Sequence, residues 1–231
     1  MPANHLVPPI GDSALALAVL ELEPGDETAL ADLDSDSLFY VAAGAGALAL
    51  GADSFELGEG AAGLVLAGEE ATVAGGARGL VLVHATAGAG ADRHAPLGPR
   101  ETIVSSTGVD AARATGARSF RLLFGPHNGS TRATLFVGFV PPGKAPWHYH
   151  LYDEIVWVPE GPGRLHQGDA VTELGPGSAF RLRPREVHIV ENTSVDRELA
   201  VVGVFTPAGS PSAAYLTADV AAAYSFAGFA G

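Results

Sequence analysis

The sequence predicts an all-β protein made of two similar units, each a sandwich or barrel of short strands. Three observations lead to this prediction. Short runs of Val, Leu, Ile, Phe and Ala recur along the 231 residues, and glycine-rich turns separate them. The 30 glycines and 16 prolines are spread along the chain, which is typical of many turns and not of a disordered tract. The sequence also matches itself after a shift of domain size.

The predicted strands are clearest in the second half of the chain, where apolar runs of strand length follow one another closely. In chain order these runs are RSFRLLF, TRATLFVGFV, EIVWV, GRLHQG, SAFRLR, VHIVEN and LAVVGVF. Runs of this length and spacing indicate a β-sandwich or barrel. The tail at 210–224 differs, because Ser210 and Pro211 precede an alanine-rich run. This pattern predicts a short C-terminal helix.

The internal repeat has a shift of 117 residues. It places DSLFYVAAGAGAL at 36–48 over DEIVWVPEGPGRL at 153–165. It also places LGEGAAGLVLAGEEATV at 57–73 over LGPGSAFRLRPREVHIV at 174–190. Self-similarity with a period of this size predicts the duplication of one small fold.

The boundary between the two copies falls in the non-periodic stretch around 95–115, so we expect one unit at 1–105 and the other at 106–231. The charge divides at nearly the same place. Residues 1–110 hold 3 Lys or Arg and 16 Asp or Glu, whereas residues 111–231 hold 10 of each kind. The uneven charge indicates that the two units do different jobs.

The composition excludes several classes of partner and site. A net charge of −13 argues against nucleic acid or an anionic membrane surface as a partner. Cysteine is absent, so a metal would be held by nitrogen and oxygen atoms. The N-terminus lacks a basic stretch before its short apolar run, and no apolar run approaches the roughly 20 residues of a membrane helix. We therefore expect a cytoplasmic protein that acts on a small molecule.

One short stretch concentrates good metal ligands. His148 and His150 alternate on a predicted strand, so their side chains point the same way. Glu154 would lie roughly 13 Å from His150 on an extended chain, which is far beyond metal-bond range. The chain must therefore turn back and bring Glu154 in from an adjoining strand. His188, in an apolar run after a proline-marked turn, is the best candidate for the fourth ligand.

The first copy of the repeat lacks all of these ligands. The shift of 117 residues places Ser37 at the position of Glu154 and Ala71 at that of His188. Near His148 the first copy has only the run ALADL. A purely structural role for the histidines would not predict their joint absence, so we expect a metal in the second unit only.

The ligand spacing resembles that of the cupin superfamily. The pattern G-x4-H-x-H-x3-E-x6-G is similar to the first cupin motif, and a second set of residues is similar to the second motif. The first motif is met by Gly143, His148, His150, Glu154 and Gly161, and the second by Gly177, Pro184, His188 and Asn192. Two departures are Glu186, where the second motif usually has glycine, and a Pro184–His188 spacing that is one residue short. The resemblance covers most of residues 119–206, and it reaches 15–85 only through the repeat.

This resemblance implies a bicupin, which has two jelly-roll barrels (double-stranded β-helices) in one chain. It further implies a site with three histidines and one glutamate for one divalent metal ion: Fe, Mn, Ni, Cu or Zn. Imidazole and carboxylate ligands suit these metals. Such an ion can act as a Lewis acid, lower the pKa of bound water, or bind O2 beside a chelated substrate.

Substrate contacts are less sharply defined. Tyr152 lies in the turn between the ligands and could overhang the site, although an ordinary half-exposed loop tyrosine is the simpler expectation. Arg121 lies in a predicted strand and could bind an anion if it faces inward. Asn192 could touch substrate, but it more simply satisfies backbone groups. Trp157 has the opposite parity to Glu154 and should pack outside the barrel.

The predicted function is that of a metal-dependent enzyme acting on a small oxygen-rich metabolite. The resemblance favours a dioxygenase-type oxidoreductase similar to quercetinase-like cupins, in which Glu154 would be both ligand and catalytic base. A hydrolase, isomerase or decarboxylase is an alternative, with an architecture like ureidoglycine aminohydrolase but a different ligand set. A non-catalytic binding protein or a sensor is a further alternative. The first unit would then serve for packing and dimerisation, giving a homodimer.

Overall fold

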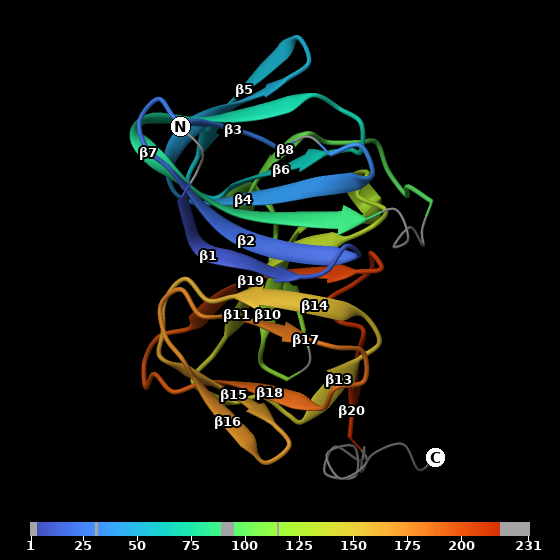
Figure 1. Cartoon of the computed structure of the whole chain (residues 1–231). Coiled ribbons are helices and arrows are strands. Elements are labelled where there is room, and N and C mark those ends of the chain that lie inside the picture. Colours follow the sequence, from blue (N-terminus) through green and yellow to red (C-terminus); the bar gives the residue numbers. More distant parts are fainter. Residues whose placement is uncertain (1–3, 31, 89–94, 115, 218–231) are drawn as a thin grey trace.

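The computed structural model describes residues 4–30, 32–88, 95–114 and 116–217 of the 231-residue chain. Its strands form three sheets, which confirms the predicted all-β fold class (Figure 1). The described residues contain only two short 3-10 helices, η2 at Ser106–Gly108 and η3 at Pro126–Asn128.

The N-terminal part forms one eight-stranded sheet. The order along the sheet is β1-β2-β7-β4-β6-β8, with β3 paired to β7 and β5 paired to β4. All of these strands are paired antiparallel. The strands are β1 Asn4–Gly11, β2 Leu15–Leu22, β3 Glu27–Ala29, β4 Ser35–Leu50, β5 Asp53–Gly58, β6 Ala61–Val65, β7 Ala71–Gly88 and β8 Ile103–Ser105.

The C-terminal part is built from two six-stranded sheets. One has the order β17-β14-β19-β11-β10-β9, and the other has β16-β15-β18-β13-β20 with β12 paired to β18. The strands of the first are β9 Ala112–Arg113, β10 Ser119–Phe124, β11 Thr134–Val140, β14 Asp153–Trp157, β17 Ala179–Leu182 and β19 Leu199–Thr206. Those of the second are β12 Gly143–Lys144, β13 His148–His150, β15 Gly163–Gln167, β16 Ala170–Leu174, β18 His188–Asn192 and β20 Ala214–Leu216.

The internal repeat is visible in the strand pairing. In the N-terminal part Ser37 pairs with Val65, and in the C-terminal part Glu154 pairs with Leu182, so both partners shift by 117. The same shift holds for the next three pairs along β4·β6 and β14·β17. A common register over four successive pairs means that the two halves share backbone geometry as well as sequence.

The two parts pack face to face through one apolar core (Figure 1). Alternating side chains of β2 and β4 contact apolar side chains of β11, β14 and β19. Trp157 belongs to this core and is 7% exposed, as its parity predicts for a side chain outside the second barrel. Apolar burial across this layer therefore fixes how the two sheets face each other.

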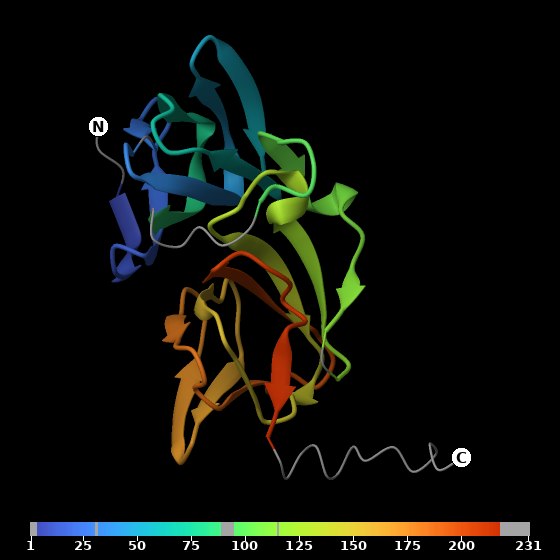
Figure 2. The same cartoon turned by 90° about the vertical axis from the view of Figure 1, so that its right-hand side faces the viewer.

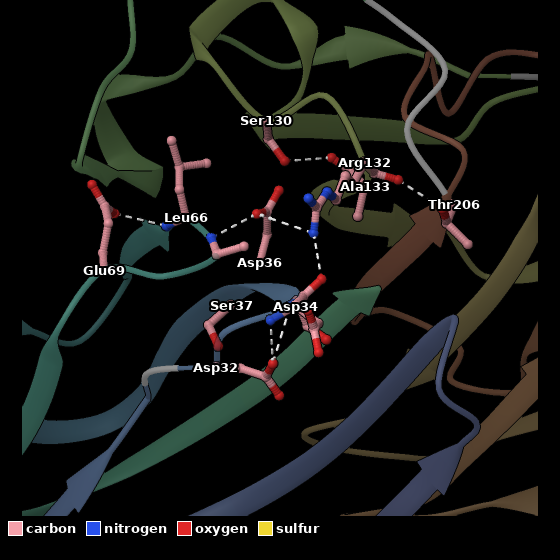
Figure 3. Close-up of polar contacts among 12 residues, drawn as sticks. Asp32, Asp34, Asp36, Ser37, Leu66, Glu69, Ser130, Arg132, Ala133 and Thr206 are labelled. Carbon is pink, nitrogen blue, oxygen red and sulfur yellow. Dashed lines mark hydrogen bonds and ion pairs between the residues drawn. The ribbon is translucent and has the colours of Figure 1, made fainter. Parts of the chain in front are cut away.

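Polar contacts also tie the two parts together (Figure 3). The Arg132 guanidinium donates from Nη1 to the Asp34 carbonyl over 2.7 Å and lies 3.7 Å from Asp36 Oδ1. Asp36 is buried and also accepts the Ala67 backbone N–H at 2.9 Å. Thr206 in turn donates to the Arg132 carbonyl at 2.6 Å.

The tail of the chain contradicts the predicted C-terminal helix where the structure describes it. Within 210–217 the chain forms strand β20, which pairs with β13. Tyr215 lies opposite Tyr149, and their rings stack with centroids 5.4 Å apart. Pairing to an open sheet edge has overridden the local helix preference. Residues 218–224 of the predicted helix lie outside the described residues.

The chain passes from the first sheet to the others between β8 and β9. Strand β8 still pairs with β6, whereas β9 pairs with β10 (Figure 2). The division into independent domains at residues 105 and 106 stays a prediction. None of the helices in the described ranges is long and apolar enough to span a membrane.

Candidate metal centre

The chain turns back sharply between two of the predicted ligands. His148 and His150 lie on β13 in one sheet, and Glu154 lies on β14 in the other. The turn at Leu151–Tyr152 carries the chain from one sheet to the next, as the spacing predicts. It leaves His150 Nε2 only 2.9 Å from Glu154 Oε2.

His188 joins this group from a neighbouring strand. It lies on β18, directly opposite His148 in the antiparallel pairing. The ring centroids are 4.4 Å apart for His148 and His188, and 5.0 Å apart for His150 and His188. All four predicted ligands are buried, with His148, His150, Glu154 and His188 each exposed by 6% or less. The structure therefore gathers residues that the sequence separates by up to 40 positions.

Each histidine is anchored through the same ring atom. The Nδ1 atoms of His148, His150 and His188 each lie 2.8 Å from a backbone carbonyl oxygen. The acceptors are the carbonyls of Pro146, Tyr152 and Glu186, respectively. A carbonyl only accepts, so Nδ1 carries the proton and Nε2 presents a bare lone pair. This is the pattern by which proteins orient histidines for a metal ion.

The contact between His150 and Glu154 fits two ligands of one ion. Its 2.9 Å separation lacks hydrogen-bond geometry, and buried His150 Nε2 has no hydrogen-bond partner. Two neighbouring octahedral ligands at about 2.1 Å from one ion are about 3.0 Å apart. A lone pair facing a carboxylate is unfavourable without a cation, so the donor set fits a divalent metal ion.

One contact engages the ring atom through which His148 would bind a metal. Arg118 Nη1 lies 3.3 Å from His148 Nε2, the atom that would bind a metal. Among the residues that the structure describes, no group of three or more His, Asp or Glu side chains has the arrangement of a formed ion site. A metal at this site would therefore have to replace the Arg118 contact to His148.

Burial and charge set the protonation of the histidines. Burial, with the Arg118 charge beside it, lowers the pKa of His148 to about 3. Burial likewise lowers the pKa of His188. For His150, burial also acts to lower the pKa, but the Glu154 carboxylate, the Tyr152 carbonyl and Asp153 together raise it more, so the net shift is upward. Neutral His148 and His188 are the forms that bind metals.

The four residues line a small cavity of about 80 Å³. Its charged side chains are Arg118 and Glu154, and most of its wall is apolar. The apolar lining includes Phe120, Phe136, Val140, Val156, Leu182, Val190 and Val201. At roughly 10–15 Å³ for each water, this volume holds about five to eight water-sized atoms.

The other predicted substrate residues are placed differently. Tyr152 lines the cavity but is buried, which contradicts the half-exposed loop position that the sequence suggests. Its ring stacks on His150 at 4.0 Å and on Phe205 at 3.9 Å, because the turn folds it inward. Asn192 lies outside the cavity lining and donates to the Val140 and Arg197 carbonyls. Arg121 also lies outside this lining and donates to the Ser106 carbonyl.

Sequence reasoning missed Arg118. It directly precedes β10, lies 30 positions before His148, and belongs to no ligand motif. A single arginine before a strand carries no sequence signal that would mark it as facing a metal site. Only the folding of β10 over the cavity brings its guanidinium to the ligands.

Comparison with known proteins finds a family-model match within the C-terminal part. Residues 135–205 match the family model described as Cupin domain. This range contains all four predicted ligands. L-ectoine synthases of Rhodococcus opacus and Rhodococcus jostii are each 41% identical to this chain over 63 residues. That match covers 26% of this chain, and it spans about half, 46%, of the length of those curated relatives.

Solved structures share the fold at low identity. The oxalate decarboxylase of Bacillus subtilis matches with a TM-score of 0.70 and 14% identity, covering 88% of this chain and 71% of that one. AerE from Microcystis aeruginosa matches with a TM-score of 0.70 and 10% identity, covering 88% and 96%. Protein Ylba from E. coli matches with a TM-score of 0.67 and 10% identity, covering 84% and 77%. These neighbours place the chain in the cupin jelly-roll fold.

Proposed function

We propose that the protein is a mononuclear metal-dependent bicupin enzyme that acts on a small oxygen-rich metabolite. The observation that carries this proposal is the common anchoring of His148, His150 and His188, whose bare Nε2 atoms share one buried pocket with Glu154. The shared register of the two halves, and structural matches covering 88% of the chain, support the bicupin assignment.

The proposal assigns roles to the four ligands and to Tyr152. The three imidazoles and the Glu154 carboxylate would hold one divalent ion, which supplies a Lewis acid when bound. Glu154 would also accept a proton from substrate through the carboxylate oxygen not engaged as a ligand. Tyr152 would fix His150 by stacking on its ring, which its buried position supports.

Within this class we favour decarboxylation, isomerisation or hydrolysis over dioxygenation. The cavity of about 80 Å³ is far below the roughly 300–1,000 Å³ of pockets for drug-sized ligands, so a large polycyclic substrate does not fit. Similarity in fold to an oxalate decarboxylase and in sequence to L-ectoine synthases agrees with chemistry on small molecules.

Metal analysis tests the proposal. The natively purified protein should contain about one equivalent of Mn, Fe, Ni, Cu or Zn, and the His148→Ala/His188→Ala double variant should contain almost none. His127→Ala, at an exposed histidine outside the cavity, is the matched control and should keep the metal. A chain that takes up no metal even on reconstitution would overturn the proposal and favour a non-catalytic binding protein.

The homodimer is a separate proposal. The support for it is indirect, because the N-terminal part lacks the ligand set and would be available for packing against another subunit. Sedimentation velocity over a wide concentration range should give twice the 23.5 kDa chain mass. A mass of one chain at every concentration would contradict it.

A further inference from the structure

We propose that Arg118 binds the anionic group of a small carboxylate substrate and couples the binding of that anion to the binding of the metal. This inference rests on the proposed function, because it concerns the same cavity. It adds the charge of the substrate, the residue that recognises it, and a coupling between anion and metal that the ligand set alone does not contain.

Arg118 is positioned by the fold to face the ligands. It ends the turn between β9 and β10, where the Ala114 N–H donates to its carbonyl at 2.9 Å. Its side chain then reaches into the cavity whose remaining wall is largely apolar. Burial lowers the pKa of the Arg118 guanidinium, and Glu154 acts in the opposite direction. An arginine remains charged at neutral pH even so, and a buried positive charge favours an anion beside it.

The contact to His148 makes two states mutually exclusive. A guanidinium has only donors, so Nη1–H of Arg118 points at the Nε2 lone pair of His148 over 3.3 Å. A metal ion needs that same lone pair. Any group that draws the guanidinium away from His148 therefore favours the metal-bound state. A carboxylate does this well, because it accepts two parallel hydrogen bonds from an arginine.

Charge and size define the class of substrate. A divalent ion with three neutral histidines and one carboxylate carries a net charge of about +1, and Arg118 adds a second positive charge. A ligand with two negative charges neutralises this pocket, and one with a single negative charge halves its net charge. The volume of about 80 Å³ limits it to roughly five to eight non-hydrogen atoms, which describes a small mono- or dicarboxylate.

Linkage makes the coupling measurable. If the anion raises metal affinity, the metal raises anion affinity by the same factor. Couplings of this kind change affinity about 5- to 150-fold. Removing the guanidinium should abolish the coupling, and in the absence of anion it should strengthen metal binding, because His148 Nε2 loses its competitor.

The experiment titrates chelator-treated full-length protein with Mn²⁺ by calorimetry, with excess acetate, with excess acetamide, and with neither. Acetamide is a neutral compound of the same shape and separates charge from volume. We expect acetate, but not acetamide, to lower the Mn²⁺ dissociation constant at least 5-fold in the wild type. Arg118→Gln should bind Mn²⁺ at least as tightly as the wild type without acetate, and acetate should have no effect on it.

Arg113→Gln is the matched control, because it removes the same charge from an exposed position on β9 just before the same turn. It should behave as the wild type. An acetate effect that survives in Arg118→Gln would overturn the role of Arg118, and so would Mn²⁺ binding by the wild type without any acetate effect. Both results would leave the proposed function standing. No Mn²⁺ binding by the wild type would overturn the proposed function and this inference with it.

Discussion

The two halves of the molecule show what one backbone does with two different sets of side chains. In the C-terminal part, Glu154 lies on β14, which pairs with β19, the strand that carries Gly203. In the N-terminal part, Ser37 corresponds to Glu154 through the repeat, and His84 takes the place of Gly203 in the strand pairing. Gly203 pairs with Val156 and Phe136, and His84 pairs with Phe39 and Ala18. The predicted metal ligands therefore lie in one half, although the corresponding strands of both halves pair in the same register.

Different side chains fill the space beside these positions in the two halves. A Cβ at Gly203 would lie 2.4 Å from the Phe136 ring and 3.2 Å from Glu154 Oε1. In the N-terminal part the small residue is Ala18, and the imidazole of His84 takes the room, with Nε2 3.1 Å from Ser37 Oγ. Gly203 therefore leaves room for the Phe136 ring and the Glu154 carboxylate, whereas His84 fills the space beside Ser37.

The positions of the other ligands differ in polarity. Near the counterparts of His148 and His188, the N-terminal part has Leu30 and Ala71, both buried in its apolar core. The Leu30 N–H donates to the Ala71 carbonyl at 3.0 Å, so the backbones still meet. Apolar side chains here strengthen the core and leave nothing to hold an ion.

The largest effect should come from replacing Glu154 with serine, the residue at the equivalent position 37 of the N-terminal part. Glu154→Ser should weaken Mn²⁺ binding at least 100-fold, because the variant keeps three neutral ligands but loses the only negative one. Competition with a fluorescent chelator measures this change. Ser37→Ala, at the equivalent position, is the control and should leave Mn²⁺ affinity unchanged. Equal losses in both variants would contradict the division of roles.

The second prediction concerns the glycine that makes room for the carboxylate. Gly203→Ala should lower the free energy of unfolding by about 1–3 kcal/mol, because its Cβ overpacks against Phe136. Urea unfolding measures this loss. Gly175→Ala, where a Cβ would have open space, should change stability little. A Gly203→Ala variant as stable as the control would show that the Phe136 ring can move aside.

The third prediction uses pH to distinguish the counterpart histidine. Burial lowers the pKa of His84 to about 4, from an ordinary 6.5. The unfolded chain then binds a proton at His84 more readily than the folded protein does. The free energy of unfolding therefore falls as the pH drops from 6.5 towards about 4. Protonation of His84 in the unfolded chain should lower the free energy of unfolding by about 2 kcal/mol between pH 7 and pH 5. His84→Gln should remove that part of the pH dependence in urea unfolding, and an unchanged slope would contradict it.

The smallest effects should come from two ion pairs at equivalent acidic positions. Asp153 accepts two hydrogen bonds from Arg181, at 2.8 and 2.6 Å, and Asp36 lies 3.7 Å from Arg132. Arg181→Gln should lower the free energy of unfolding by about 1.5 kcal/mol, because the partly buried carboxylate keeps no equivalent donor. Arg132→Gln should cost less, about 1 kcal/mol, because Asp36 lies 3.7 Å from the guanidinium and keeps the hydrogen bond from the Ala67 N–H. Thermal unfolding of both variants compares them, and a larger loss for Arg132→Gln would reverse the ranking.

The sequence by itself determined the fold class and the repeat, and it predicts a ligand set whose members the structure brings together. Apolar runs of strand length predict sheets, because side-chain alternation is a local property of the strand. The H-x-H-x3-E spacing predicts a turn between ligands, because an extended chain cannot bring His150 to Glu154. The repeat then indicates which half can hold a metal. These predictions depend on spacing along the chain, which the sequence contains.

Only the tertiary structure decided the rest, because it depends on residues that are distant in sequence. Strand β20 forms in place of the predicted helix because the edge of β13 lies within reach of the tail. Tyr152 is buried because Phe205 supplies a surface on which it stacks. Arg118 reaches His148 because the turn before β10 passes over the cavity. Each of these contacts joins segments whose meeting no local pattern encodes.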